Sequence, residues 1–422
     1  MSSWYRLDNA GKLYPALIGP RRTTVFRLSA DLVAPVHAPR LQKALDRIMP
    51  RFPFYAVNLR HGVFWYSLVQ SPHQPQVVRD SKYPCMRFPL KNRGMFPFRV
   101  RAWRNRIAVE FSHVLADGTG AATFLQSLLA EYLALSGVPR GHLGNIPKPG
   151  SLPLAEEEED AFRRFGDINF PDPPPLEKAF RLPLRLERPG YYRVISGTMP
   201  VAKLKQCATD YDCTMTEFLA GVMLDSYREI LLEMPKELLK RHIAPLRINI
   251  PVNLRQLWPT ATLRNFFVSV EPEIDPRLGE WKFDEIIDRT KTHMRYEVDR
   301  RYLGRRMARN VRGELNPWAR ALPLGLKNIV LPIAYASFAE KKYSTGLSNL
   351  GLMKLPQHLA PYVKRFDFIP PPAPEEKVKA AVIGWKDSIS MSFGRLIRPA
   401  IVEQYVFRKL IRMGVPVKVQ GN

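Results

Sequence analysis

A histidine and an aspartate, whose side chains can transfer protons, lie close together in the first half of the chain, and a glycine follows them. Asp117 lies four positions after His113, and Gly118 follows directly. Imidazole titrates near neutral pH, so a histidine held at a fixed point can both take and return a proton. A lone histidine is usually a surface or core residue, but a strand-like segment precedes this one and a glycine turn follows it. The pattern therefore indicates a general base.

The flanking residues predict the elements that hold this histidine. Apolar residues alternate with polar ones over 106–113, which predicts a strand that ends at His113. Apolar residues then recur at helical spacing beyond Gly118, and either Asp117 or Thr119 can cap that helix. A strand, a sharp turn and a helix together place the histidine where a cleft is commonly built.

The rest of the chain alternates short strands and helices. A Thr-x-x-Glu capping box begins at Thr214 and predicts the start of a second long helix. Other segments show the periodicity of a helix (39–52) or of strands: 24–28, 62–69, 194–199, 246–252, 266–270, 366–369, 380–385 and 389–393. The predicted fold class is therefore α/β, an α+β sandwich built twice.

The chain length and a proline-rich stretch indicate how the chain is divided into domains. It has 422 residues, more than one hydrophobic core usually serves. Residues 146–190 are rich in proline and hold an acidic cluster, which is typical of an extended crossover linker. We therefore predict an N-terminal domain over 1–145, which carries the histidine, and a C-terminal domain over 191–422.

The charge is strongly basic. The 64 Lys and Arg residues against 39 Asp and Glu give a net charge of +25, which favours an acidic carrier protein, a membrane surface or a phosphorylated ligand as partner. Nucleic acid is not expected, because no nucleic-acid-binding motif accompanies the charge. A dense part of it lies in the region 289–312, whose basic residues form either a solvated helix face or a surface that attracts an anionic ligand.

Other features exclude several classes of protein. The mean hydropathy is −0.22, and no apolar run reaches the about 20 residues of a membrane span. The nearest approach, 321–339, is broken by Pro323, Lys327 and Pro332, so we expect a buried helix pair there rather than a membrane contact. The first residues lack the pattern of a signal peptide, so we expect a cytoplasmic protein.

Metals and bound cofactors are not indicated. The three cysteines, Cys85, Cys207 and Cys213, lack metal-ligand spacing and are expected to be reduced thiols. No metal-binding histidine motif is present. We therefore expect neither a metal site nor a permanently bound cofactor.

The motif from His113 to Gly118 resembles the His-x-x-x-Asp-Gly signature of the CoA-dependent acyltransferase superfamily. That superfamily includes chloramphenicol acetyltransferases, condensation domains of peptide synthetases, plant BAHD acyltransferases and alcohol O-acetyltransferases. Further stretches, in the same order along nearly the whole chain, look like those of bacterial alcohol acetyltransferase-like proteins: Trp4–Ala10, Arg51–Pro53, Phe64–Tyr66, Pro251–Arg255, Arg264–Phe266 and Ser348–Gly351.

The resemblance implies a fold and a reaction. It implies two chloramphenicol-acetyltransferase-like domains in one chain, with His113 near the middle of a tunnel between them. Acyl-CoA, as acetyl-CoA, would enter as a co-substrate, and a small-molecule alcohol or amine would accept the acyl group. His113 would act as general base in a direct transfer without an acyl-enzyme. A single chain can form such a site, so we expect a monomer.

The resemblance also implies roles for individual residues. Asp117 would be structural and pair with an arginine, either Arg255 or Arg264. Gly118 suits a turn that needs a positive φ and close approach. The remaining candidates are Thr345, Ser348 and Asn349 as oxyanion or acceptor contacts, Asn265 and Trp385 as substrate contacts, and the aromatic residues Phe266 and Phe267.

Two departures narrow the reaction, and two alternatives stay open. Ser112 stands where condensation domains usually carry a second histidine, and the BAHD Asp-Phe-Gly-Trp-Gly motif has only a loose counterpart at 392–395. Peptide condensation is thus less expected than simple acyl transfer. An acyl-carrier-protein or lipid-linked donor is one alternative. A non-catalytic binding protein on the same scaffold is the other.

Overall fold

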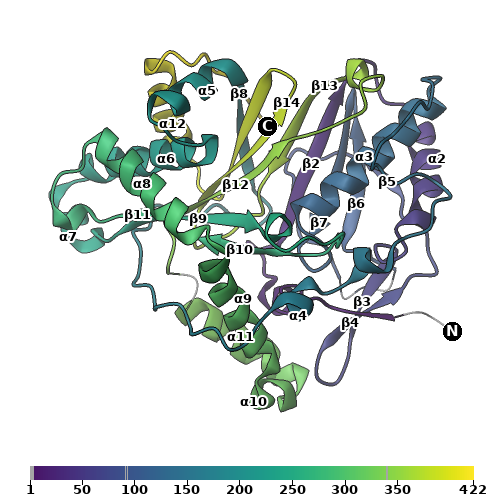
Figure 1. Cartoon of the computed structure of the whole chain (residues 1–422), viewed down its shortest axis with the longest axis horizontal. Coiled ribbons are helices and arrows are strands. Elements are labelled where there is room, and N and C mark those ends of the chain that lie inside the picture. The colour runs from purple at the N-terminus through teal and green to yellow at the C-terminus, as the bar shows by residue number, and fades with distance from the viewer. Residues whose placement is uncertain (1–3, 91, 93, 339–340) are drawn as a thin grey trace.

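The computed structural model describes residues 4–90, 92, 94–338 and 341–422, and residues 1–3, 91, 93, 339 and 340 lie outside it. Helices and strands are mixed along the chain, and the described strands form three sheets (Figure 1). Among the described residues, none of the helices combines the length and the apolar character that a membrane crossing needs. The predicted α/β class is confirmed.

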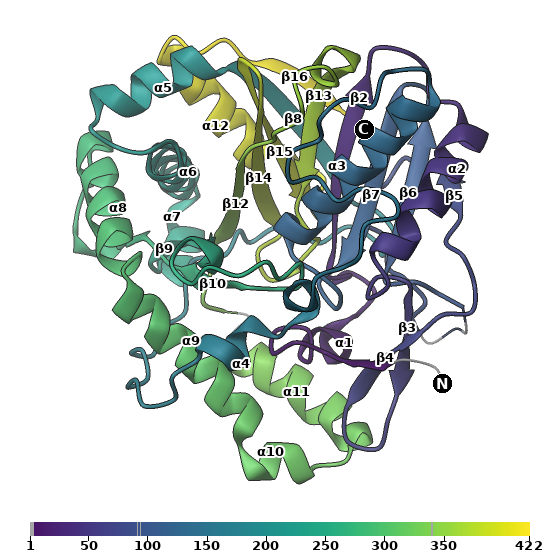
Figure 2. The same ribbon diagram turned by 45° about the vertical axis from the view of Figure 1, so that its right-hand side comes forward.

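The first large sheet carries the histidine motif. Its strand order is β13-β2-β7-β6-β5. These strands are β2 (Val25–Leu32), β5 (Val77–Arg79), β6 (Phe98–Trp103), β7 (Arg106–Ser112) and β13 (Val363–Ile369). The helices α2 (Ala38–Ile48) and α3 (Gly118–Leu135) pack against each other beside this sheet (Figure 2). The strand β13 comes from the C-terminal half of the chain, so both halves build this sheet.

The second large sheet has the order β10-β9-β12-β14-β15-β8-β16, with β11 paired to β9. Its strands are β8 (Arg193–Pro200), β9 (Leu246–Asn253), β10 (Phe267–Val270), β11 (Glu273–Ile274), β12 (Thr345–Leu352), β14 (Val378–Trp385), β15 (Ser388–Arg395) and β16 (Lys418–Gly421). The helices near it are α5 (Val201–Asp210), α6 (Met215–Leu232), α7 (Lys236–His242), α8 (Phe283–Glu297) and α12 (Ile401–Arg412). The helix α6 packs centrally, because it contacts α5, α8, α12 and β9.

A third, small sheet and several short elements complete the structure. The small sheet has the order β1-β4-β3, from β1 (Trp4–Arg6), β3 (Val57–His61) and β4 (Tyr66–Gln70). The helices α10 (Pro317–Ala321) and α11 (Leu324–Phe338) lie near its hairpin (Figure 2). The other helices are α1 (Tyr14–Leu17), α4 (Ala161–Phe165) and α9 (Arg300–Leu315), and 3₁₀ turns occur at Met49–Arg51, Ala155–Glu158, Leu254–Gln256, Pro276–Leu278 and Ala360–Tyr362.

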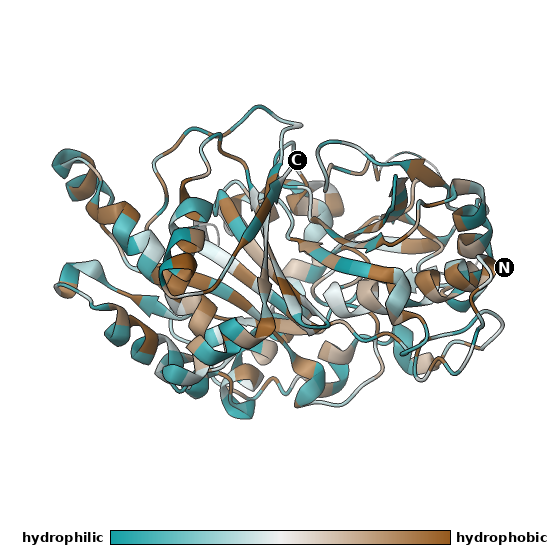
Figure 3. Cartoon of the chain, turned by 90° about the horizontal axis from the view of Figure 1, so that it is seen from above, coloured by the Kyte–Doolittle hydropathy of each residue, from teal (hydrophilic) through white to brown (hydrophobic). Residues whose placement is uncertain are grey.

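The buried apolar side chains form two cores. One draws on residues 7–138 and also on 353–396, and the other draws mainly on 161–415. Viewed from above, apolar residues alternate with polar ones along many of the elements, as amphipathic packing requires (Figure 3). The two cores agree with a chain too long for one core, but the first core and its sheet include residues far beyond position 145.

The proline-rich crossover at 146–190 is mostly irregular and is packed at specific points. Phe162 and Phe180 are buried in the second core. Glu157 accepts two hydrogen bonds of 2.6 Å from Arg51, and both side chains are buried. This mostly irregular segment is therefore anchored to both halves of the chain.

Local sequence signals explain the two long helices. The Asp117 side chain accepts hydrogen bonds from the backbone N–H groups of Thr119 and Gly120, so it is the N-cap of α3. The Thr214 capping box is present at the start of α6, with Glu217 as its second member. Both predictions are confirmed.

Two sequence predictions are wrong in part. The strand predicted over 62–69 begins only at Tyr66, because residues 62–65 form the turn between β3 and β4. The segment 321–339 was expected to be a buried helix pair; Ala339 lies outside the described residues. Most of the rest forms α11, and Ile329 and Ile333 on that helix are 60% and 61% exposed. The helix α11 is apolar on more than one face, so its composition alone predicted burial.

The basic region 289–312 is more than a solvated face. Its apolar residues Leu303, Met307 and Val311 are buried in the second core. Arg306 is also buried and forms ion pairs with Glu271 and Glu297. Arg312 donates to the backbone oxygens of the crossover at residues 168 and 170, so part of the charge holds the crossover in place.

Candidate active site

His113 follows the last residue of β7 and is held by its backbone. Its N–H donates to the backbone oxygen of Thr24 at 2.9 Å, and its own oxygen accepts from Asn265 Nδ2 at 2.8 Å. Thr24 adopts a φ of +58°, a conformation that is uncommon for a β-branched residue and that marks a tightly constrained position. The main chain around the histidine is therefore fixed from both sides.

The Asn265 side chain fixes the proton on the imidazole. Asn265 Nδ2 donates to acceptors only, the carboxylate of Asp8 at 2.9 Å and the His113 backbone oxygen. Its Oδ1 therefore faces His113 Nδ1, at 3.2 Å. Because Oδ1 can only accept, Nδ1 carries the hydrogen and Nε2 is left as the basic atom of the ring.

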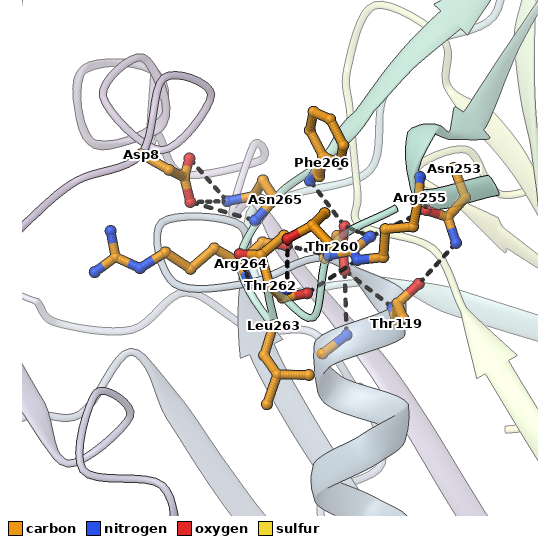
Figure 4. A network of polar contacts seen from close by, with 12 residues as sticks. Asp8, Thr119, Asn253, Arg255, Thr260, Thr262, Leu263, Arg264, Asn265 and Phe266 are labelled. Atoms are coloured by element: carbon orange, nitrogen blue, oxygen red, sulfur yellow. Dashed lines mark hydrogen bonds and ion pairs between the residues drawn. The ribbon is translucent and has the colours of Figure 1, made fainter. Parts of the chain in front are cut away.

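Asp8 completes a line of three groups, Asp8–Asn265–His113 (Figure 4 shows the first two). Asp8 is buried, and burial, reinforced by the nearby Asp160 charge, raises the pKa of this carboxyl to about 6. Asp8 also accepts from the Gly11 backbone at 2.6 Å, which orders the N-terminal loop around the site. Sequence reasoning did not single out Asp8 as a site residue, because 257 positions separate it from Asn265.

Three aromatic rings surround His113. The centroids of Phe26, Tyr14 and Phe267 lie 4.7, 5.2 and 5.7 Å from that of the imidazole. Burial lowers the pKa of His113 to about 4, partly opposed by the hydrogen bond with Asn265. The ring is therefore neutral near pH 7, and its Nε2 lone pair is available to accept a proton.

Asp117 braces the turn after His113 and does not face the imidazole as a partner. Its Oδ1 accepts from the N–H groups of Thr119 and Gly120, each at 3.1 Å. Its Oδ2 accepts from Arg255 Nη1 at 2.8 Å and from the Phe266 N–H at 3.0 Å. These four contacts join α3 to the segment that leads into β10.

Of the two arginines considered, the structure pairs Arg255 with Asp117. Arg255 also donates to the backbone oxygens of Thr262 and Arg264 at 2.9 and 2.6 Å (Figure 4). Arg264 lies elsewhere and donates to the backbone oxygen of Arg6 at 2.6 Å. Arg255 thus closes the 255–264 loop that presents Asn265 to His113.

The start of α3 leaves little room for a Cβ at Gly118 and none at Gly120. Gly118 is the first residue of the helix and is not among the positive-φ residues of the described chain, so the expectation of a positive φ is wrong. A Cβ there would lie 2.6 Å from Leu350 Cδ2. At Gly120 a Cβ would overlap the backbone oxygen of Leu263, which cannot move aside as a side chain can.

His113 opens into a cavity of about 220 Å³, which we call the His113 cavity. Its wall is partly charged. Glu376 forms a 2.9 Å ion pair with Lys379, and Glu375 accepts from Arg22. The remaining oxygen of Glu376 and the Oδ1 of Asn249 are buried and have no hydrogen-bond partner among the described residues. Two acceptor atoms of cavity-lining residues are therefore left without a donor in the described part of the chain.

Some of the other predicted site residues line the cavity, and others do not. Ser348, Asn349 and Phe267 line it. Thr345 does not, since it is buried and donates to the Val378 oxygen at 2.8 Å. Trp385 also lies away, with its Nε1 donating to the Val363 oxygen. Asn265 contacts His113 and Asp8, and Phe266 is buried in the second core.

Asn349 and Ser112 have structural contacts of their own. Asn349 Nδ2 donates to Thr216 Oγ1 at 2.9 Å, and its Oδ1 accepts from the Gly351 N–H. Ser112 is buried, and its hydroxyl lies 3.0 Å from that of Thr24. Of the three residues predicted as oxyanion contacts, Ser348 lines the cavity, and the contacts described above do not involve its side chain.

A second cavity of about 440 Å³ adjoins the first. We call it the Arg306 cavity. The two share the lining residues Tyr14, Phe267, Ser269 and Tyr343. Its charged lining residues are Lys12, Arg306 and Arg309 together with Glu271 and Glu314; Lys12 pairs with Glu314, and Arg306 pairs with Glu271.

No family model matches the chain, and no curated protein matches it in sequence. Solved structures resemble it in fold. Polyketide synthase associated protein 5 from Mycobacterium tuberculosis is 14% identical, with 96% of each chain covered and a TM-score of 0.59. The condensation domain that mediates chain release from the enacyloxin polyketide synthase is 15% identical, with 97% of this chain and 82% of that chain covered and a TM-score of 0.56.

A third similar structure is the epimerization domain from the third module of tyrocidine synthetase B. It is 10% identical, with 98% of this chain and 95% of that chain covered and a TM-score of 0.57. The chain therefore shares the fold of these condensation and epimerization domains, and membership of the superfamily that the His-x-x-x-Asp-Gly motif resembles stays a prediction. The finer resemblance to alcohol acetyltransferase-like proteins stays a prediction.

Proposed function

We propose that the chain is an acyltransferase that moves an acyl group from a thioester to a hydroxyl or amine acceptor, with His113 as general base. The observation that carries this proposal is the neutral imidazole at the cavity wall, with Nδ1 hydrogen-bonded to Asn265 and Nε2 left as its basic atom. A base of this kind, fixed beside a cavity, is what a direct acyl transfer requires.

The proton follows one route through the reaction. His113 Nε2 takes the proton of the acceptor as its oxygen or nitrogen attacks the thioester carbonyl. The tetrahedral intermediate then collapses, the carbon–sulfur bond breaks, and the imidazolium returns the proton to the departing thiolate. Asn265 and Asp8 hold the ring throughout, and the Asp8 charge stabilises the imidazolium through the intervening amide.

The oxyanion of that intermediate needs a hydrogen-bond donor. Ser348 lines the His113 cavity, so we propose its hydroxyl for this role. Thr345 and Asn349 are weaker candidates because their side chains already bond Val378 and Thr216. Loss of one such donor slows acyl transfer by roughly 10²-fold or more.

The donor is a thioester carried either by an acyl carrier protein or by coenzyme A. The shared fold with a condensation domain that mediates chain release from a polyketide synthase favours a carrier-bound donor. Acyl-CoA is the second candidate, because the exposed Arg309 lines the Arg306 cavity and would attract a phosphate group. In either case the two adjoining cavities would form one tunnel with His113 along it.

A donor comparison tests the proposal. Thiol release is followed with acyl-CoA and with the same acyl group on a carrier protein, each over a panel of alcohols and amines. The proposal predicts acceptor-dependent thiol release from at least one donor, and faster release from the carrier. The chain is a non-catalytic binding protein on this scaffold if one of the donors binds but neither releases thiol with any acceptor.

A further inference from the structure

The helix α11 exposes an apolar stripe. Leu326, Ile329, Val330 and Ile333 are between 49% and 61% exposed. Their spacing of three, four and seven residues places them on one face of the helix. Large apolar side chains gathered on an exposed helix face mark a site of contact with another surface.

The opposite face of α11 forms part of the site already described. Leu324 and Lys327 are buried, Leu331 lines the Arg306 cavity, and Tyr335 lines the His113 cavity. These residues recur at the spacing of a second helix face. The same helix thus separates the two cavities from solvent and carries the exposed stripe outside.

Neighbouring elements extend this surface. Trp318 on α10 is 85% exposed, and at the tip of the β3–β4 hairpin Val63 is 74% exposed. The tip and α11 are joined, because the Leu324 N–H donates to the Val63 oxygen at 2.8 Å and Lys327 Nζ donates to the Phe64 oxygen at 2.8 Å. In Figures 1 and 2, α10, α11 and the hairpin lie together at the lower edge of the molecule.

The charges around the stripe are basic. Arg320 on α10 and Arg60 on β3 are exposed. In the sequence from 300 to 342 the acidic residues are Glu314 and Glu340, and Glu314 forms ion pairs with Lys12 and Arg163. Exposed aliphatic and tryptophan side chains with basic flanks are the composition of a surface that lies on an anionic bilayer.

We propose that α10, α11 and the β3–β4 hairpin tip form a docking surface for an anionic lipid bilayer. The stripe of α11 enters the headgroup region, and the basic residues contact lipid phosphates. Because α11 also forms the wall of both cavities, docking brings the tunnel next to the bilayer and gives a lipophilic substrate a short path to His113. This last step rests on the proposed acyltransferase function; the docking itself does not.

Vesicle sedimentation with the full chain tests the docking. The double variant Ile329→Ser/Ile333→Ser is compared with a matched control, Leu232→Ser/Leu278→Ser, whose leucines are 57% and 78% exposed on other elements. The chain should bind phosphatidylglycerol vesicles and bind pure phosphatidylcholine about tenfold or more weakly. The α11 variant should lose about tenfold or more in affinity for the anionic vesicles, and the control pair should keep it.

Other outcomes overturn the proposal. If the wild-type chain stays in the supernatant with anionic vesicles, the surface does not bind lipid and a protein partner is left to cover it. If the α11 variant sediments like the wild type, the charge alone binds and the stripe has no part. Circular dichroism melting verifies that both variants are folded.

Activity separates the docking from the reaction. With a water-soluble acceptor, the α11 variant should react as the wild type does, because neither isoleucine lines a cavity. With a long-chain acceptor embedded in anionic vesicles, its rate should fall about tenfold or more, in line with the lost binding. Equal rates on the embedded acceptor would contradict access from the bilayer, and a chain inactive on every acceptor would leave the vesicle-binding result to stand by itself.

Discussion

Asn265 Oδ1 lies 3.2 Å from His113 Nδ1 and sets the tautomer of the imidazole across 152 positions of sequence. Replacing Asn265 with alanine removes the acceptor, so the ring is free to rotate or to adopt the other tautomer. We expect kcat to fall by about 10²-fold with little change in KM, because positioning acts mainly in the transition state. Steady-state kinetics measures both constants.

The matched control for that variant is Asn105→Ala. Asn105 donates to the Leu32 oxygen at 2.9 Å, so it is also an amide anchored to the backbone, at the end of β2 away from the His113 cavity. Its kcat should stay within about twofold of the wild type. A similar loss of kcat in both variants would mean that Asn265 acts through stability alone.

Asp8 should add a second decrease of the rate on the acidic side of the pH–rate profile. Burial raises its pKa to about 6, so below that pH the carboxyl is protonated and no longer stabilises the imidazolium. Burial lowers the pKa of His113 to about 4, so the base itself is lost only below that pH. The wild-type rate should thus fall in two steps on acidification. In Asp8→Asn the step near pH 6 should vanish and the plateau should be lower; persistence of that step would exclude Asp8 as its source.

The fold and half of the site could be predicted from the sequence. The strand, turn and helix around His113 were predictable because their periodicity and caps are local. Asp8 was not, because the stretch 4–10 resembles the family only as a whole, and nothing local shows that its loop brings the Asp8 carboxylate to Asn265. Trp385 was misplaced since strand residues alternate between faces, and sequence could not tell which face looks into the cavity. The exposed stripe of α11 could not be predicted, because a run of apolar residues has the same sequence pattern whether it is buried or exposed.

The Asp117–Arg255 pair should contribute strongly to stability. Both side chains are nearly buried, and Asp117 makes four contacts that join two parts of the chain. Arg255→Ala leaves that carboxylate without its cation, so the free energy of unfolding should fall by about 3 kcal/mol or more in urea titrations.

An exposed arginine provides the comparison. Arg277 is 40% exposed in its ion pairs with Glu177 and Asp275. Arg277→Ala should therefore cost far less stability than Arg255→Ala, because an exposed ion pair contributes little. If the two variants lost the same stability, Asp117 would not depend on Arg255 and the brace would have to lie elsewhere.

Glycine substitutions test the close approach at the start of α3. In Gly120→Ala the new methyl group overlaps the Leu263 oxygen, so the loop before Asn265 must shift and both stability and kcat should fall. Gly313→Ala is the opposite case, because it lies in α9 with open space around it. That variant should gain about 0.5–1 kcal/mol from helix propensity. Thermal melting orders the two, and a stabilised Gly120→Ala would contradict the contact.

The carboxylates of the His113 cavity predict the preferred acceptor. Glu376 lines this cavity and pairs with Lys379 through one of its two oxygens, so its carboxylate should attract an acceptor that carries an amine as well as a hydroxyl. An amino alcohol should react with about tenfold higher kcat/KM than a simple alcohol of equal length. Glu376→Gln should reduce this preference. Glu375→Gln should not, because Glu375 is already held by Arg22; equal effects would remove Glu376 from acceptor recognition.

The role of His113 as general base is tested by thiol release in the His113→Ala variant. The variant is assayed with the best donor and acceptor pair of the wild type, after melting shows that it is folded. We expect the rate to fall by about 10²- to 10⁴-fold across the pH range above 5, because the proton acceptor is gone. A folded His113→Ala variant that releases thiol at the wild-type rate would contradict the account.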